Sequence, residues 1–414
     1  MMIIPPLIFG QTGKITLDYC LKKALENAPE SNIPELNGEI SGLKTKNINT
    51  NYFPLFNLNG QVSYQSDVTK VPLPPLPQFS VEPLSKDWYK LNVNLSQMIW
   101  DGGYASAMKR VEKSNLQLSN GETDMALYNI KEQVIKLFFS ALLLRDNISV
   151  LKITKKNIEE QISDGQKAVD NGIMLVADLN ALKVEKNLLE QSIIKTSEDA
   201  KGIMGALSQI TGENITGIES LKKPEVSSFN LDFVNNRPDF VLLSLQQKHL
   251  ETLKKISSAK RMPKFVAFGQ AGYGRPGYDM LNNNFDTYFM IGLKLNWQIY
   301  DWNKVKREKQ ILSIQNSIID LKKERINQNL KAELEKQKAE IDKFEKLIKS
   351  DHQIISLQKT VEDKALSQLK NGTLTPTNYL LEVNKLAKLQ MQALAHELQL
   401  LYAKYMYITL MGNL

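Results

Sequence analysis

Three histidines, one glycine-rich segment and a single cysteine are the residues of this chain whose types could carry out chemistry. The pair His396-Glu397 lacks the second histidine that a zinc-binding helix needs, and His249 and His352 are isolated. The segment GQAGYGRPG, residues 269–277, lacks the lysine followed by serine or threonine of a phosphate-binding loop. The lone Cys20 allows neither an internal disulfide nor a cysteine metal cluster. The sequence therefore predicts no catalytic residue, no metal site and no cofactor, and we do not expect an enzyme.

Charge and apolar runs limit the possible partners. Lysine and arginine number 52 against 45 aspartates and glutamates, a net charge of +7. The lysines are spread among glutamates with no dense basic cluster, so we expect no nucleic-acid partner. No run approaches the roughly 18 apolar residues of a membrane-spanning helix. Residues 1–13, MMIIPPLIFGQTG, resemble the end of a secretory signal peptide without its basic region; the alternative is an ordinary hydrophobic N-terminus.

The chain matches itself at an offset of about 200 residues, which indicates two copies of one structural unit. Ile99-Trp100-Asp101 matches Ile299-Tyr300-Asp301, and Asn171-Gly172 matches Asn371-Gly372. We therefore divide the chain into a leader at 1–13, a first repeat at 14–213, a linker at 214–234 and a second repeat at 235–414.

Each repeat has the same order of predicted elements: a helix, a β-hairpin, a very long helix, a short break and a return helix. Asp101 and Asp301 are the predicted N-caps of the long helices. The first repeat has its first helix from Leu17 to Thr50, its hairpin at about 55–100, its long helix from Gly103 to Asp170, its break at about 171–176 and its return helix from Val176 to about Ile210. In the second repeat the same elements are predicted at Pro238 to Arg261, about 264–300, Asn303 to Lys370, about 371–376, and Thr377 to about Tyr407.

Alternation of apolar and polar residues predicts the strands. It is clear at 55–64, 91–99 and 289–299 and weakest at 264–273. Each segment has about 10 residues, the length of a membrane-spanning β-strand. The polar positions hold asparagine, glutamine, serine and lysine, which suit a water-filled lumen. A soluble hairpin would alternate in the same way and is the alternative.

Aromatic residues in or beside these segments favour the membrane reading, because transmembrane barrels carry aromatic girdles at both interfaces. Four strands do not close a barrel, whose smallest membrane size is about eight, and lipid does not tolerate open edges. Three chains would together supply twelve strands. The predicted girdle residues are Trp88, Trp100, Tyr288, Trp297, Tyr300 and Trp302.

Apolar residues of the long helices recur at spacings of three and four, the pattern of a coiled-coil seam. Ile158 and Ile162 lie on this seam in the first repeat, and Ile348, Ile355 and Leu369 lie on it in the second.

Taken in order, the segments ITLDYCLKKALENAPE, YFPLFNLNGQVSY, LSQMIWDGGYASAMKR, VDNGIMLVADLNALK and LKNGTLTPTNYLLEVNKL resemble the TolC family of outer-membrane efflux proteins. The resemblance covers nearly the whole chain. It implies a membrane α+β fold, in which four strands per chain contribute to a trimeric 12-stranded β-barrel continued by a long helical coiled-coil tunnel through the periplasm. It also implies a homotrimer in the outer membrane of a Gram-negative bacterium, in contact with outer-membrane lipid.

The resemblance further implies a function as the exit duct of a tripartite efflux pump, of RND or ABC type, with a periplasmic adaptor protein and an inner-membrane transporter. An exit duct for type I protein secretion is one alternative, because nothing in the chain identifies the cargo. A soluble coiled-coil scaffold protein is an alternative of another class.

In that family the breaks between long helices are periplasmic tips, where the adaptor docks and the tunnel closes. Carried over, the docking tips are Asn171, Gly172, Ile173 and Leu175 in the first repeat and Asn371, Gly372, Thr373 and Leu374 in the second. Family members often have aspartates just beyond the second tip, but Asn378 and Leu381 stand there, with Glu382 beside them. Asp178 matches an acidic position after the first tip. The predicted constriction is therefore Asp178, Asn378, Leu381 and Glu382, closed by packing more than by charge.

Overall fold

The computed structural model describes residues 15–68, 84–215, 217–225, 236–280 and 282–413. The predicted leader at 1–13 and part of the predicted linker at 214–234 lie outside these residues. None of the helices in the described ranges has both the length and the apolar character needed to cross a membrane.

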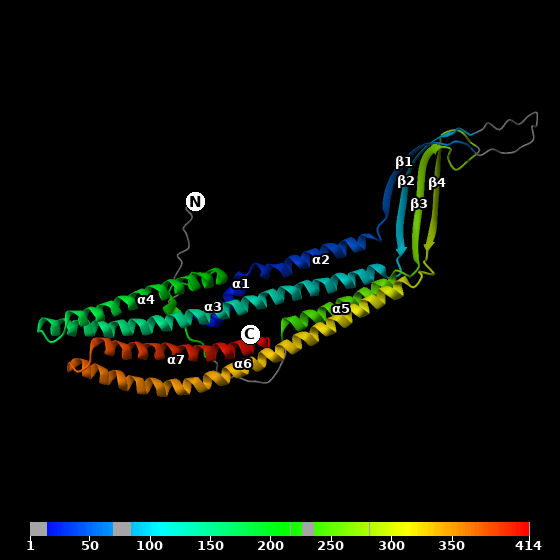
Figure 1. Cartoon of the computed structure of the whole chain (residues 1–414). Helices are drawn as coiled ribbons and strands as arrows, with labels where there is room; N and C mark the ends of the chain where they lie inside the picture. The colour runs from blue at the N-terminus through cyan, green and yellow to red at the C-terminus, as the bar shows by residue number, and fades with distance from the viewer. Residues whose placement is uncertain (1–14, 69–83, 216, 226–235, 281, 414) are drawn as a thin grey trace, which may run out of the picture. The chain divides into compact units, whose positions relative to one another are not determined.

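Helices and strands follow one another in the predicted order in both repeats (Figure 1). The helices are α1 (Leu17–Asn27), η1 (Pro29–Asn32), α2 (Ile33–Thr50), α3 (Tyr104–Asp170), α4 (Val176–Thr211), η2 (Ile218–Ser220), α5 (Pro238–Ala259), α6 (Lys304–Lys370) and α7 (Pro376–Leu410). The strands are β1 (Leu55–Tyr64), β2 (Asp87–Trp100), β3 (Lys264–Arg275) and β4 (Asp286–Asn296).

The prediction of one helix from Leu17 to Thr50 is wrong at its middle. Pro29 has no backbone N–H to donate, and it disfavours helical geometry at the preceding residue. Ala28 accordingly adopts an extended conformation, with φ −62° and ψ 125°. The chain passes through the short 3₁₀ helix η1 before α2 begins, so the segment consists of two α-helices.

The four strands form one antiparallel sheet in the order β1-β2-β3-β4, side by side in Figure 1. The predicted hairpins β1–β2 and β3–β4 are therefore joined by pairing between β2 and β3, which come from different repeats. The fourth strand ends at Asn296, so Trp297 and Ile299, which the alternation placed in it, lie beyond its end.

Residues directly opposite each other on paired strands share a face of the sheet, so the register sorts the side chains into two faces. One set of opposed residues is Asn57, Asn94, Gln270 and Met290, and we call this side the polar face. The adjacent set is Leu58, Val93, Ala271 and Phe289, on the side we call the apolar face.

Asp101 and Asp301 cap the two long helices, as predicted. Asp101 Oδ1 accepts a hydrogen bond from the Gly103 N–H at 2.9 Å, and its Oδ2 accepts one from the Ala105 N–H at 2.6 Å. Asp301 Oδ2 accepts one from the Val305 N–H at 3.0 Å, and this bond holds the pKa of Asp301 below its ordinary value. A carboxylate at this position satisfies N–H groups that the first helical turn leaves without partners.

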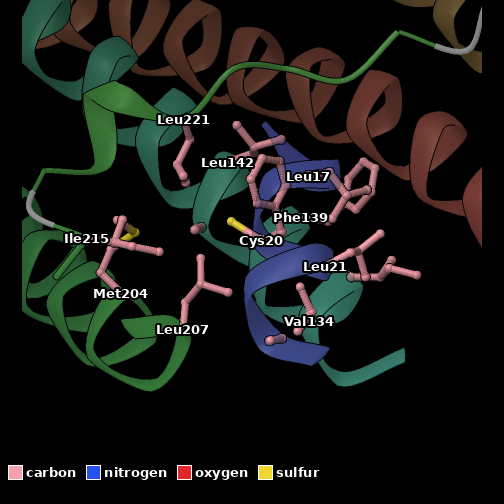
Figure 2. Close-up of a cluster of buried hydrophobic side chains, with 14 of the residues drawn as sticks. Leu17, Cys20, Leu21, Val134, Phe139, Leu142, Met204, Leu207, Ile215 and Leu221 are labelled. Atoms are coloured by element: carbon pink, nitrogen blue, oxygen red, sulfur yellow. The ribbon is translucent and has the colours of Figure 1, made fainter. Parts of the chain in front are cut away.

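The chain forms two compact units that each take segments from both repeats. Unit 1 contains residues 1–33, 121–242 and 323–414, and unit 2 contains residues 34–120 and 243–322. In unit 1, side chains of α1, α3 and α4 gather around the buried Cys20 (Figure 2). In unit 2, Ala107 and Val111 of α3 pack against Ile256 and Ala259 of α5.

Candidate functional site

The two helical breaks in unit 1 have the same backbone structure, built around Gly172 and Gly372. Both glycines have a φ of 72°, the left-handed region that favours glycine. At the first break the Gly172 N–H donates to Val169 O at 2.9 Å and the Ile173 N–H donates to Ala168 O at 2.8 Å. This is the Schellman arrangement, which satisfies the last carbonyls of a helix.

The second break repeats these bonds 200 residues later. The Gly372 N–H donates to Leu369 O at 3.0 Å, and the Thr373 N–H donates to Gln368 O at 3.0 Å. We call residues 171–175 the first tip and residues 371–375 the second tip. The sequence match at Asn-Gly therefore reflects one local structure made twice.

The tips differ in how the return helix starts. Thr375 accepts a hydrogen bond at Oγ1 from the Asn378 N–H at 3.4 Å, and Pro376 occupies the first turn of α7. The corresponding N-cap of α4 is Leu175, whose side chain makes no capping bond. The first tip instead exposes apolar side chains, since Ile173 is 77% exposed and Leu175 is 71% exposed.

The second tip presents a polar end. Asn371 and Thr373 are exposed, whereas Leu374 is half-buried against the apolar cluster that also holds Leu369 and Tyr379. Leu374 thus corresponds in position to Met174, not to Leu175. The predicted docking residues are therefore all surface residues of the tips except Leu374, whose side chain mainly packs.

A groove of about 440 Å³ lies between the two tips. Gly165, Met174 and Leu182 line it from the α3/α4 pair, which we call the first hairpin. Leu374 and Pro376 line it from the α6/α7 pair, which we call the second hairpin. A Cβ on Gly165 would lie 3.3 Å from both Leu179 Cδ1 and Met174 Sδ, so glycine permits this close packing.

The predicted constriction residues fall into two places. Asn378, Leu381 and Glu382 line a recess of about 380 Å³ between α6 and α7. Asp178 lines the other groove, between the tips. The structure of one chain thus brings three of the four together and separates Asp178 from them.

Buried and half-buried polar pairs join α6 to α7 near the second tip, and sequence reasoning missed them. Gln358 Nε2 donates to Glu382 Oε2 at 2.7 Å. The Tyr379 hydroxyl donates to Glu362 Oε1 at 3.2 Å, although both residues are buried. Burial, and then the charge of Glu362, raises the pKa of Tyr379 above the ordinary tyrosine value.

The same polar seam continues along the helices, where His396 Nδ1 lies 2.7 Å from Asp351 Oδ2. Asp351, Gln358 and Glu362 occupy heptad core positions, and that polarity was the signal available in the sequence. In the first hairpin the cross-helix ion pairs are more exposed, as in the 2.9 Å contact between Lys155 Nζ and Glu190 Oε1.

The sheet of unit 2 has aromatic residues at both ends, but not all of the predicted ones belong to the apolar face. Trp88 and Tyr288 share the polar face with Asn92, whose Nδ2 is 3.5 Å from the Tyr288 hydroxyl. The register therefore places both residues outside the apolar face, and the girdle itself stays a prediction. Tyr89 and Tyr273 occupy that end of the apolar face instead.

At the helix end, a bulge in β2 between Met98 and Trp100 turns Trp100 to the apolar face. There it contacts Phe265, with ring centroids 6.0 Å apart. Trp297, Tyr300 and Trp302 follow β4 and are exposed.

Two of the residues with catalytic side-chain types, His249 and Cys20, lie in packed surroundings, whereas His352 is exposed. His249 Nδ1 is 2.9 Å from Ser114 Oγ, and burial lowers the pKa of His249. Burial raises the pKa of Cys20 to about 12. In the ranges that the structure describes, no three histidine, cysteine, aspartate or glutamate side chains gather where a metal ion would bind.

No protein-family model matches this chain, and no curated protein sequence matches it either. Solved structures of outer-membrane proteins do match it over nearly its whole length. The Campylobacter jejuni CmeC outer membrane channel is 14% identical, with a TM-score of 0.66 over 96% of this chain and 85% of that chain.

The Neisseria gonorrhoeae MtrE outer membrane channel in its open state is 16% identical, with a TM-score of 0.67 over 96% of this chain and 89% of that chain. The Vibrio cholerae outer membrane protein VceC is 14% identical, with a TM-score of 0.65 over 94% of this chain and 95% of that chain.

Proposed function

Starting from the fold of outer-membrane channel proteins, which this chain has, we propose that three copies form an outer-membrane channel-tunnel, the exit duct of a tripartite efflux pump in a Gram-negative bacterium. The helical part lies in the periplasm, and the tips meet a periplasmic adaptor and an inner-membrane transporter. The protein carries out no bond chemistry in this role.

The sheet is the observation that carries the proposal. Its apolar face is open to the surroundings, with Leu58 70% exposed and Ile291 80% exposed. Among the residues that the structure describes, both edge strands, β1 and β4, pair on one side only. A lone chain in water would expose this apolar surface and the unpaired backbone N–H and C=O groups of two edge strands. In a closed barrel the apolar face meets lipid and the edge strands pair with those of neighbouring chains.

Aromatic residues support the same placement of the sheet. Tyr89 and Tyr273 mark one end of the apolar face, and Trp100 and Phe265 mark the other. At about 3.4 Å per residue, Phe265 and Tyr273 are roughly 27 Å apart along β3. This separation is close to the apolar band of outer-membrane barrels, about 25 Å tall.

Exposed apolar stripes on two helices of unit 2 support association of several chains. Leu36, Ile40 and Leu43 of α2 follow the coiled-coil spacing. Residues of α6 do the same, namely Ile311, Ile314, Ile318 and Leu321. Two different stripes on one unit suit a head-to-tail ring, in which α2 of one copy packs on α6 of the next.

The second hairpin supplies the gate in this proposal. Its seam is held by polar pairs such as Gln358 with Glu382, which can exchange protein partners for water when the helices separate. An adaptor that binds the open packing better than the closed one shifts the population toward the open state. The apolar end of the first tip, Ile173 and Leu175, gives that adaptor a fixed surface.

Reconstitution of the purified full chain in a planar bilayer tests the proposal. We expect a trimer in detergent by cross-linking and discrete conductance steps in the bilayer. Replacing Glu382 with alanine should raise the conductance or open probability, because Gln358 loses its partner. A protein that stays monomeric without detergent at high concentration, and that never conducts, would favour the soluble scaffold and end the proposal.

A further inference from the structure

The two faces of the sheet differ in whether their charged residues form ion pairs. On the apolar face the charged residues of the four strands are Asp87 and Arg275, and they form an ion pair with each other. The Arg275 guanidinium also lies over the rings of Tyr89, at 5.5 Å, and Phe285, at 5.3 Å. Charge on this face is therefore locally neutralised.

The polar face carries three lysines, Lys90, Lys264 and Lys294, and one carboxylate, Asp286. None of the three lysines makes an ion pair with a carboxylate of residues 15–68, 84–215, 217–225, 236–280 or 282–413. Lys90 Nζ lies 4.9 Å from the centroid of the Trp88 ring, and this contact leaves its charge in place.

Position along the strands concentrates the positive charge at the helix end of the sheet. Lys264 pairs with Asn296 and Lys294 pairs with Val266, so the two lysines are diagonal neighbours. The Cα atoms of such neighbours are about 7–8 Å apart. Asp286 begins β4 at the other end, where it and Lys90 both lie opposite Gly274. They are thus two strand spacings apart, about 10 Å.

We propose that these lysines form a cationic ring in the lumen that selects anions, so that the duct carries organic anions. This rests on the proposed function, in which the polar face lines the barrel. Three copies would place six lysines, Lys264 and Lys294 of each chain, near one level. Lysine rings favour anion passage, and the low-dielectric wall focuses their field. Two neighbouring lysines without a carboxylate repel each other, and a passing anion relieves that repulsion.

The test is the reversal potential of the reconstituted channel in a planar bilayer with a KCl gradient. Wild type should pass chloride in preference to potassium. The double variant K264Q/K294Q should lose most of that preference, and K264E/K294E should prefer potassium. D286N, which removes the carboxylate from the same face, should strengthen the preference for chloride.

A matched control changes net charge equally elsewhere. K22Q/K201Q removes two lysines of unit 1 with exposed side chains, each near a glutamate, and should leave selectivity unchanged. Conductance steps show that each variant has assembled. If a double variant does not assemble, K294Q alone should lower the preference in the same direction.

The outcomes separate the two proposals. A conducting wild type that prefers potassium, or a preference that K264Q/K294Q leaves intact, overturns the anion inference and spares the channel. An equal effect of the control also overturns it, because overall charge would then be the cause. A wild type that forms no channel overturns both.

Discussion

The helical hairpins α3/α4 and α6/α7 share one backbone structure at the tip but differ in the side chains of the seam between their two helices. Five buried or half-buried seam positions of the first hairpin are apolar, and the positions 200 residues later are polar: Leu151, Ile158, Ile162, Leu179 and Leu182 against Asp351, Gln358, Glu362, Tyr379 and Glu382. Opening an apolar seam to water costs free energy, whereas polar groups can exchange their protein partners for water. In the proposed duct, the first hairpin would therefore stay closed while the second is free to separate.

Ile158→Gln should have the largest effect. It places in the first hairpin the glutamine that stands at the equivalent position 358 of the second hairpin, but without the glutamate that pairs with Gln358. Ile158 and the neighbouring Leu182 are 0% exposed. Lost apolar burial and an unsatisfied amide should together cost about 3–5 kcal/mol. Native-state hydrogen exchange of α3 and α4 measures this as faster local opening. Ile153→Gln, at an exposed position of the same helix, is the control and should change little.

The double change Gln358→Leu and Glu382→Leu makes the seam of the second hairpin apolar like that of the first. It should make the second hairpin more stable. Replacing a polar pair by apolar residues of similar size stabilises by up to about 1–4 kcal/mol. Exchange in α6 and α7 should slow, and channel opening in the bilayer should become rarer. E335Q/K338Q, which removes an exposed ion pair of α6, should do neither. A variant that opens as often as wild type would mean that this seam is not the moving one.

Tyr379→Phe should weaken the second hairpin by about 1–3 kcal/mol, because the buried Glu362 loses a donor. The matched change at the exposed Tyr300 should have no measurable effect on exchange. Equal effects would show that the hydroxyl contributes nothing to the seam.

The same tyrosine predicts a pH dependence. Its pKa is raised in the folded chain, by burial first, so the unfolded state loses its proton at lower pH than the folded state does. The stability that protonated Tyr379 contributes to the folded chain is fully present below the ordinary tyrosine pKa, about 10, and is lost as pH rises above it. Thermal unfolding followed by circular dichroism should decline above that pH less steeply in Y379F than in wild type.

Gly172→Ala and Gly372→Ala should have the smallest effects and should be equal. Nothing lies within 4 Å of a Cβ at either position, so only the left-handed backbone is penalised, by about 1–2 kcal/mol. Hydrogen exchange at the two tips measures each loss. A clear difference between them would mean that the tips differ in backbone as well as in seam.

The repeat, the strands and the tips were predictable because each depends on local or periodic signals. Asn-Gly fixes a left-handed turn, and alternation fixes the faces of a strand, so β1 was predicted at 55–64, where it lies. The two α-helices before β1 were predicted as one helix, although the segment from Pro29 to Asn32 separates them.

The polar seam was not predictable to the same depth. Glu362 and Tyr379 stand on different helices, and the sequence does not state which polar side chains will meet across a seam. The faces of Trp88 and Trp100 depended on strand register and on a bulge, which shift a side chain to the opposite face without changing composition.

Pairing between β2 and β3 has a consequence for how the protein matures. Each tip closes between residues a few positions apart, whereas Tyr89 pairs with Arg275 only after most of the chain has been made. Closure over such a separation is slow, so the helical arms should form early and the sheet late. Until then the strands are apolar segments with open edges in water, the kind of intermediate that aggregates unless a chaperone holds it.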